Sequence, residues 1–381
     1  MCRIQCNACS QGSSPFPRIT AVLGNGAVTS SDISAELRST VADAFEQGAA
    51  LEIQGGGTKQ FYGRRPTGSL LRVNGHQGIV NYEPTELVVS VRSGTRLSEL
   101  QQILAEAKQM LGFEAPAFGA DATVGGMVAC GFSGPARPYR GAVRDAVLGV
   151  QIINGRGQQL RFGGEVIKNV AGYDASRLMV GAMGTLGVLL QVSLKVLPAP
   201  EVVMTRTFEM TEVLALKQMN AWAGLPLPLS ACSFYAGRLS VRLGGSGDAV
   251  LAAGREIGGD EEHDAMTWWE SLREQTLPFF AQKEPLWRLS VPPATEPMNL
   301  PGDCLIDWGG AQRWLFCEHS VDVLRQVVRD AGGHATLFRG GNRDGEIFEP
   351  LQSVQLRLQQ ELKKAFDPRS ILNPGRMVEG W

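Results

Sequence analysis

The stretch Lys168-Asn169-Val170-Ala171-Gly172-Tyr173-Asp174, followed ten residues later by Gly184-Thr185-Leu186-Gly187, is the most informative pattern in this chain. A second glycine-rich stretch, Gln54-Gly55-Gly56-Gly57-Thr58, stands upstream, directly after the short run 51–53. Three consecutive glycines weaken a strand, because glycine loses the most conformational entropy on folding and has no side chain to pack. The triple glycine therefore indicates a turn whose backbone approaches a ligand closely.

Glycine-rich turns bind phosphate groups through their backbone N–H groups. Gly55, Gly56, Gly57 and Thr58 present such groups, and 122–126 adds a glycine pair and a hydroxyl. Each hydrogen bond to a charged acceptor contributes roughly 1.5 to 3 kcal/mol, which is enough to hold a nucleotide cofactor without a covalent link. Neither turn matches the Rossmann or the P-loop pattern. A triple glycine alone is equally consistent with a flexible turn, so the prediction depends on the combination.

Composition and charge exclude several classes of function. The chain has 381 residues, of which 44% are hydrophobic and 19% charged, and its net charge is −2. The length suggests two or three globular domains. The charge gives no basic footprint for a nucleic acid. The uncharged stretch 178–194 is short and interrupted by glycine, so no membrane insertion is expected, and without a recognisable signal peptide the expected location is cytoplasmic.

The seven cysteines fall into two groups. Cys130, Cys232, Cys304 and Cys317 are scattered, as expected for buried thiols in a reducing compartment. Cys2, Cys6 and Cys9 have a spacing that suits an iron-sulfur cluster, while the alternative is a loose N-terminal extension over 1–28 in which they have no role. We favour the extension and expect no metal.

Hydrophobic periodicity predicts the elements around the glycine turns. Residues 32–47 keep helical spacing, and 86–92 form a valine-rich strand. A helix follows from residue 97, with Thr95 as its expected N-cap. From 188 to 196 apolar and polar residues alternate, which predicts a half-buried strand.

Pro198 and Pro200 end that strand and give the expected domain boundary. Strand 239–243 and helix 321–330 predict a mixed second part, and helix 353–366 precedes a tail that two prolines should hold extended. The predicted divisions are the extension 1–28, a cofactor domain 29–200, a second domain 201–366, and a tail 367–381 that docks on the cofactor domain.

Taken in order, these stretches resemble the FAD-binding domain of the vanillyl-alcohol oxidase family, also called the PCMH type. The resemblance covers about residues 30 to 377. It implies an α+β fold with a two-subdomain FAD-binding domain and a smaller α+β cap-like domain. The stretches that carry it are 53–63, 122–126, 131–135, 143–145, 168–198, 308–315 and 332–339.

The resemblance also implies roles for single residues. The triple glycine and Thr58 would bind the pyrophosphate, with Lys59 and Gln60 beside them. Flat ring systems need small residues and donors close by, so residues of 185–188 would pack beside the flavin, where Lys168 is a further candidate. The remaining implied FAD contacts are Thr123, Gly125, Gly126, Gly141, Val143, Thr185, Leu186, Gly187 and Val188.

Many relatives tether the flavin through a histidine near the glycine loop. The nearest histidine in this chain is His76, which we expect in a surface loop, so the resemblance implies non-covalent FAD.

For activity, the resemblance implies an FAD-binding subunit of a complex that oxidises glycolate, a small 2-hydroxy acid, to glyoxylate. The implied partners are a second FAD subunit that holds catalytic histidines and an iron-sulfur subunit that passes electrons to a membrane quinone. The complex would then lie at the inner membrane through its partners. Two alternatives stay open: a free-standing FAD-dependent dehydrogenase of a hydroxy acid or sugar, and a non-catalytic assembly subunit with structural FAD.

Candidates for catalysis in this chain are few. Oxidation of a 2-hydroxy acid needs a cation for the carboxylate and a base near the hydroxyl. The histidines of the second part, His263, His319 and His334, are widely separated. Arg339 and Arg343 could form an anion site with His334, and the alternative is a polar loop at the domain interface.

Overall fold

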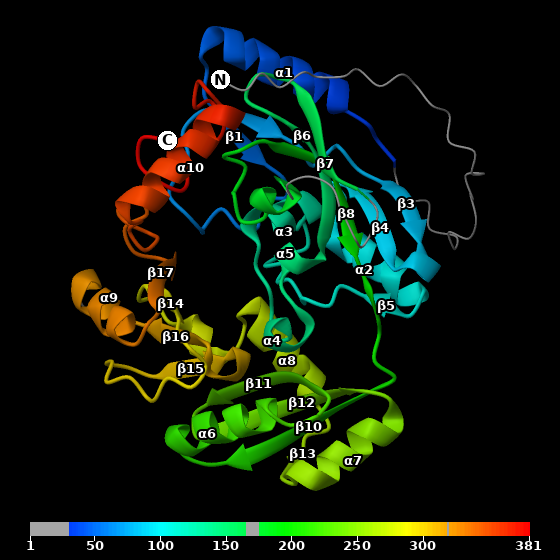
Figure 1. The fold of residues 1–381 in the computed structure, drawn as a ribbon, viewed down its shortest axis with the longest axis vertical. Coiled ribbons are helices and arrows are strands. Elements are labelled where there is room, and N and C mark those ends of the chain that lie inside the picture. Colours follow the sequence, from blue (N-terminus) through cyan, green and yellow to red (C-terminus); the bar gives the residue numbers. More distant parts are fainter. Residues whose placement is uncertain (1–29, 165–174, 318–319) are drawn as a thin grey trace.

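The computed structural model describes residues 30–164, 175–317 and 320–381, which form an α+β fold around two antiparallel sheets (Figure 1). Residues 165–174 lie outside this description, so the motif at 168–174, including Lys168, cannot be placed. The same holds for His319 and for Cys2, Cys6 and Cys9.

The first sheet has five strands, and its central strand is buried on both faces. Ser193 on this strand lies 2.7 Å from Ser90, hydroxyl to hydroxyl, on the face that the alternation assigned to solvent. The expectation of a half-buried strand was wrong, because small polar side chains pair with each other there instead of meeting water. In spatial order the strands are β3 (Ile79–Glu83), β4 (Val88–Arg92), β8 (Val188–Lys195), β6 (Val147–Ile153) and β7 (Gln159–Gly163).

A smaller unit packs beside this sheet. The parallel strands β1 (Leu51–Gln54) and β2 (Ser69–Arg72) share a core with α1 (Ser34–Gln47). Helix α1 buries Leu37, Val41 and Ala44, which confirms the predicted apolar face.

The turn after β4 differs from the prediction. Helix α2 (Leu97–Glu106) begins after Arg96, and the Thr95 hydroxyl accepts a hydrogen bond from the Gly78 backbone N–H at 2.9 Å. Thr95 therefore closes a turn between two strands and does not cap the helix. Short elements complete this part of the chain: β5 (Gln109–Met110), α3 (Val124–Cys130), α4 (Arg137–Arg140), α5 (Val143–Ala146) and β9 (Leu197–Pro198).

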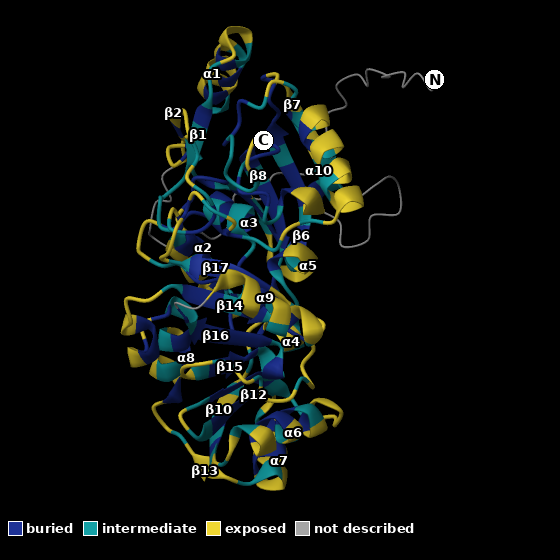
Figure 2. Cartoon of the chain, turned by 90° about the vertical axis from the view of Figure 1, so that its left-hand side faces the viewer, coloured by how far each residue is buried: buried dark blue, intermediate teal, exposed yellow. Residues whose placement is uncertain are grey.

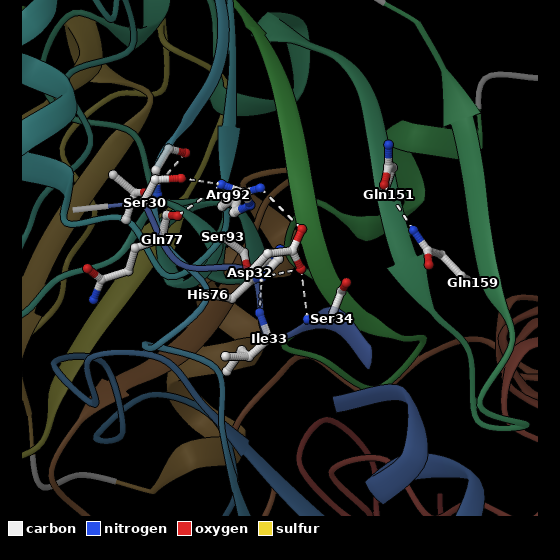
Figure 3. Close-up of polar contacts among 12 residues, drawn as sticks. Ser30, Asp32, Ile33, Ser34, His76, Gln77, Arg92, Ser93, Gln151 and Gln159 are labelled. Atoms are coloured by element: carbon white, nitrogen blue, oxygen red, sulfur yellow. Dashed lines mark hydrogen bonds and ion pairs between the residues drawn. The ribbon is translucent and has the colours of Figure 1, made fainter. Parts of the chain in front are cut away.

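His76 does not lie in a surface loop, as the sequence predicted, but is buried. His76 is 3% exposed, and its Nδ1 accepts the Ile33 backbone N–H at 3.3 Å. Burial lowers the pKa of the imidazole, and Asp32, which bonds Arg92, partly opposes this. Figure 3 shows this group beside the strands that carry Gln151 and Gln159. His76 thus fastens the start of α1 to the sheet.

After β9 the chain enters the second sheet, which has eight strands. Its β12 and α9 contain the predicted strand 239–243 and helix 321–330, and the division into domains at this crossing stays a prediction. In spatial order the strands are β13 (Asp260–Glu261), β10 (Val202–Glu209), β12 (Arg238–Gly245), β11 (Leu229–Tyr235), β15 (Cys304–Asp307), β16 (Gln312–Phe316), β14 (Leu286–Ser290) and β17 (His334–Arg339). The helices of this part are α6 (Glu212–Ala223), α7 (Gly247–Ile257), α8 (Ala265–Glu274) and α9 (Val321–Asp330).

The last helix, α10 (Ser353–Phe366), returns to the end of the molecule that holds α1 (Figure 1). The tail after it is not extended as expected. It turns around the buried Asp367, whose carboxylate accepts the backbone N–H groups of Ile371 and Leu372. The Leu51 N–H donates to the Ile371 carbonyl at 2.7 Å, so the tail lies against β1.

Aromatic and charged side chains fill the junction between the two sheets, where Figure 2 shows buried residues. Arg242 on β12 donates to both carboxylate oxygens of Glu114, at 2.7 and 2.9 Å. Glu274 at the end of α8 accepts the backbone N–H of Phe118 at 2.8 Å. Ionic contacts thus link the second sheet to loop 114–118, which precedes α3.

Asp307 on β15 is buried in this junction and provides a test of it. Burial raises the pKa of its carboxyl to about 7 from 3.8, with Glu114 adding to the shift. Between these values the folded state keeps a proton that the unfolded state loses, so this group's contribution to stability declines as pH rises from about 4 to about 7. We expect Asp307→Asn to cost more stability at pH 5 than at pH 8, with a difference of a few kcal/mol at most, measured by urea unfolding. Asp303→Asn, at an exposed carboxylate, is the matched control, and an equal cost at both pH values would contradict this assignment.

Candidate cofactor site

A cleft opens between β1, α3 and the C-terminal tail. It brings together residues from four distant stretches of the chain. The predicted residues that line it are Gly55, Gly56, Gly57, Thr58, Lys59, Gln60, Thr123, Gly125, Gly126 and Gly187.

The triple glycine is required first of all by packing within the chain. A Cβ on Gly56 would overlap the carbonyl oxygen of Asp121, and one on Gly55 would overlap the Thr123 hydroxyl. Gly57 has a φ of +74°, a conformation that favours glycine. The close approach inferred from the sequence is therefore an approach to loop 119–123.

This packing leaves the loop's donors available. Within the described residues, the backbone N–H groups of Gly55, Gly56, Gly57 and Thr58 donate to no protein acceptor, although these residues line the cleft. Buried or half-buried N–H groups are costly when unpaired. A row of them beside an open cleft fits the phosphate groups of a dinucleotide.

Helix α3 supplies the opposite wall. The Thr123 hydroxyl caps it by accepting the Gly126 N–H at 3.2 Å. Gly125 packs against Ser93, where a Cβ would collide. A Cβ on Gly126 would meet only that hydroxyl, at 3.2 Å. Gly126 therefore leaves open space in the cleft, which a flat cofactor can occupy.

Two cations and one thiol line the cleft. Lys59 donates to the Ala117 carbonyl at 3.0 Å, and Arg376 from the tail donates to the Arg64 carbonyl at 3.0 Å. Burial lowers the pKa of both side chains and raises the pKa of the Cys130 thiol. The raised pKa keeps the thiol neutral near neutral pH, so it adds no negative charge to a cleft lined by a lysine and an arginine, which suits an anionic cofactor.

The C-terminal segment holds the third wall in place. The ammonium of Lys363 is buried and donates to the Thr185 carbonyl at 2.8 Å, the Leu372 carbonyl at 3.0 Å and Asp367 at 2.7 Å. Asn373 accepts the Ile53 N–H at 2.7 Å and donates to the Met183 carbonyl. One clamp thus connects β1, the turn 183–187 and the tail.

Several predicted cofactor residues do not line the cleft. Thr185 and Leu186 are buried, with the Thr185 hydroxyl bonded to the Ala182 carbonyl, and Val188 is fully buried in the α1 core. Gly141 and Val143 lie beyond α3, where the Val143 N–H donates to Ser133. None of these residues lines the cleft as the structure has it, so their assignment to the ligand stays a prediction.

The three catalytic candidates do not converge. His334 is exposed at one end of β17, and Arg339 stands at the other end, with its guanidinium 4.7 Å from the Phe61 ring centroid. Arg343 is buried and donates to the carbonyls of Gly63 and Leu337. Burial and neighbouring cations lower its pKa to about 10. Both arginines are held by protein groups, so they form no joint anion site.

Other residues of the cleft were not identified from the sequence. Met183, Asn373, Arg376 and Cys130 all line it. The Asn-Pro-Gly-Arg turn of the tail was the available signal for Asn373 and Arg376, but only the tertiary structure shows which element it meets.

Comparison with known proteins identifies the family. A family model described as an FAD binding domain matches residues 27–163. Glycolate oxidase subunit GlcE of Escherichia coli (strain K12) is 48% identical over 346 residues, 91% of this chain and 97% of its own length. The chain belongs to the GlcE family.

More distant relatives agree with this fold. Glycolate oxidase subunit GlcD of Bacillus subtilis (strain 168) is 25% identical to the GlcE-family chain over 401 residues, covering 85% of it and 83% of GlcD. Among solved structures, alkyldihydroxyacetonephosphate synthase superposes with a TM-score of 0.63 at 14% identity, covering 89% of this chain and 74% of that one. These findings confirm the predicted α+β, FAD-binding fold.

Membrane-spanning helices and metal-binding clusters are both absent from the described residues. Within that part of the chain, no helix is long and apolar enough to cross a membrane. In the same residues, no group of three or more His, Cys, Asp or Glu side chains could hold a metal ion.

Gly126 gives a direct test of the cleft. Gly126→Val places two methyl groups in open space, so we expect FAD affinity to fall at least about ten-fold with little loss of stability. Flavin content after purification and FAD titration measure this. Gly247→Val, at the first position of α7, is the matched control. Unchanged FAD affinity in Gly126→Val would disprove the assignment, whereas Gly56→Val is uninformative because it would displace Asp121.

The Lys363 clamp generates a second prediction. Lys363→Met leaves the Asp367 carboxylate buried without its partner, so we expect a loss of about 3 to 5 kcal/mol in unfolding free energy. Because the clamp bonds the turn 183–187, FAD affinity measured on the folded fraction should fall as well. Lys364→Met changes an exposed neighbour and should affect neither quantity. A destabilised variant with wild-type FAD affinity would show that the clamp does not position the cleft.

Proposed function

We propose that this chain is the FAD-binding subunit of a complex that oxidises glycolate to glyoxylate, and that it transfers electrons within that complex. The observation that carries the proposal is the cleft itself: unpaired backbone donors of 55–58 and two cations, Lys59 and Arg376, converge in a chain of the GlcE family. The similarity to a glycolate oxidase subunit supplies the substrate class.

The chain's own residues would hold the cofactor in three places. Loop 55–58 would bind the pyrophosphate through its backbone N–H groups, which have no acceptor within the described residues. Gly126 would admit the ring system, because a side chain at this position would project into the open space of the cleft. FAD, when bound, supplies hydride acceptance and one-electron transfer. Lys59 and Arg376 would stabilise negative charge that develops in the cleft.

We assign the oxidation of the hydroxy acid to a partner subunit. Removal of the hydroxyl proton needs a base near the cofactor, and no histidine of the described residues lines the cleft. His76 is bonded to Ile33. His263, in the loop before α8, and His334, on β17, are exposed. A GlcD-type subunit is the proposed site of that step; GlcD of Bacillus subtilis is 25% identical to this chain.

The remaining parts of the proposal come from the family resemblance. They are an iron-sulfur subunit as the next electron carrier, FAD held without a covalent bond, and a location at the cytoplasmic side of the inner membrane through the partners. None of them requires a membrane helix in this chain.

Anaerobic flavin reduction tests the proposal. We expect the purified chain to contain about one FAD, and glycolate to leave its flavin absorbance unchanged. In the complex with a GlcD-type and an iron-sulfur subunit, glycolate should reduce the flavin of this chain too. Reduction in the isolated chain would instead indicate a free-standing dehydrogenase.

The variant Gly126→Val separates electron transfer from a structural role. In the complex it should abolish glycolate-dependent reduction of a quinone analogue, while the partner's flavin is still reduced. Wild-type turnover in an assembled complex that contains this variant and lacks its FAD would overturn the proposal.

A further inference from the structure

A separate cavity of about 300 Å³ lies on the face of the second sheet that α6 and α9 cover. Side chains alternate along a strand, so Arg313 and Leu315 of β16 line this cavity, whereas Trp314 between them packs in the junction between the sheets. Helix α6 packs over Phe234 and α9 over Leu315, which places the cavity between the two helices. None of its described lining residues lines the cofactor cleft.

Arg313 is the positively charged group of this cavity, and it is 1% exposed. Its guanidinium donates to the backbone carbonyls of Glu296, at 3.0 Å, of Thr295 and, at 3.5 Å, of Gly310. The second N–H of Nη1 and of Nη2 has no acceptor among the described residues. Carbonyls also supply no negative charge, and no carboxylate in those residues pairs with Arg313, although a buried charge without a counter-charge is costly. An anionic group in the cavity would complete its environment.

Glu212 supplies the opposite charge to the same cavity. It is the first residue of α6 and half-buried, and its carboxylate forms no ion pair or hydrogen bond within the described ranges. Burial lowers the pKa of the Arg313 guanidinium, and Cys304 and Glu212 oppose this shift from the cavity wall. Burial also raises the pKa of the Cys304 thiol to about 12, with Glu212 adding to the shift, so the thiol is uncharged near neutral pH. Arg313 and Glu212 therefore line one cavity with opposite charges that are not in contact.

The rest of the lining consists mostly of apolar side chains and main chain. The loop 298–304 borders one side, where Met298 and Leu300 pack against the core under α9. The hairpin turn at Ala236 and Gly237, between β11 and β12, borders another side. The apolar residues of the lining are Phe234, Met298, Leu300 and Leu315. A ligand in this cavity can therefore bury an apolar part beside its charged groups.

The charges of the lining restrict the class of ligand. An anion that carries no positive group would meet Glu212 and the exposed carboxylate of Asp303. A cation that carries no negative group would meet Arg313. Coulomb energies rise as the dielectric constant falls, so such like-charge contacts are most unfavourable beside a buried group. A zwitterion avoids both contacts, because each of its charges can lie beside the opposite charge.

We propose that this cavity binds an α-amino acid with an apolar side chain, its carboxylate on Arg313, its ammonium group on Glu212 and its side chain against the apolar wall. A carboxylate offers two acceptors to the unpaired N–H groups of the guanidinium, and an ammonium group donates to a carboxylate. A cavity of about 300 Å³ accommodates a molecule of this size. The site uses no residue of the cofactor cleft, so it stands independently of the proposed electron transfer.

Calorimetric titration of the full chain with L-leucine tests the site. We expect saturable binding of one leucine per chain. Three analogues, each of which lacks one group, should bind at least about ten-fold more weakly. Isocaproate lacks the ammonium group, isoamylamine lacks the carboxylate that Arg313 would bind, and glycine lacks the side chain. Saturating glycolate should leave the dissociation constant of leucine unchanged, because a hydroxy acid has no positive group for Glu212.

Glu212→Gln removes the negative charge from a side chain without partners, so the variant should fold normally and bind leucine at least about ten-fold more weakly. Glu256→Gln, at an exposed glutamate of α7, is the matched control and should bind like the wild type. Gly126→Val, which fills the cofactor cleft, should also keep wild-type affinity for leucine. The proposal is overturned by no saturable binding up to about 10 mM leucine, by equal binding of any of the three analogues, by competition from glycolate, by wild-type affinity in Glu212→Gln, or by loss of binding in Gly126→Val.

Discussion

The contact between Gly56 and the carbonyl of Asp121 is the constraint on which the rest of the cleft depends. Any side chain at Gly56 would push loop 119–123 away from β1. With both loops in place, Thr123 caps α3 and the donors of 55–58 face the same space as Gly126. Loop 119–123 thereby holds the N–H groups of 55–58 beside the cleft, where they are placed to bind the phosphates of a dinucleotide.

The C-terminal segment also fixes the geometry of the cleft. Lys363 and Asp367 are both buried, and every donor and acceptor they offer is directed to main chain or to each other. A buried ion pair of this kind contributes little net stability but leaves few alternative arrangements, since breaking it exposes an uncompensated charge. Arg376 reaches the cleft only because Asn373 fixes the tail against Ile53. The last fifteen residues are therefore part of the cofactor site.

The sequence predicted the turns and helices that depend on local backbone conformation and hydrophobic periodicity. The glycine turns, helix α1 with its buried Leu37 and helix α10 follow from backbone conformation and periodicity. The failures concern partners that lie far away in the chain. Val188 packs under α1 and Ser193 meets Ser90, so alternation alone could not assign the faces of β8. Met183 and Arg376 line the cleft through contacts that no short motif encodes.

The junction between the sheets has different charged residues on its two sides. Lys59 and Arg376 lie on the cleft side, and Arg288 lies on the other side of the rings of Phe61, Tyr62, Phe118, Phe132 and Phe338. Glu274 accepts the Phe118 N–H, and Arg242 bonds Glu114. These two contacts hold loop 114–118 against the second sheet.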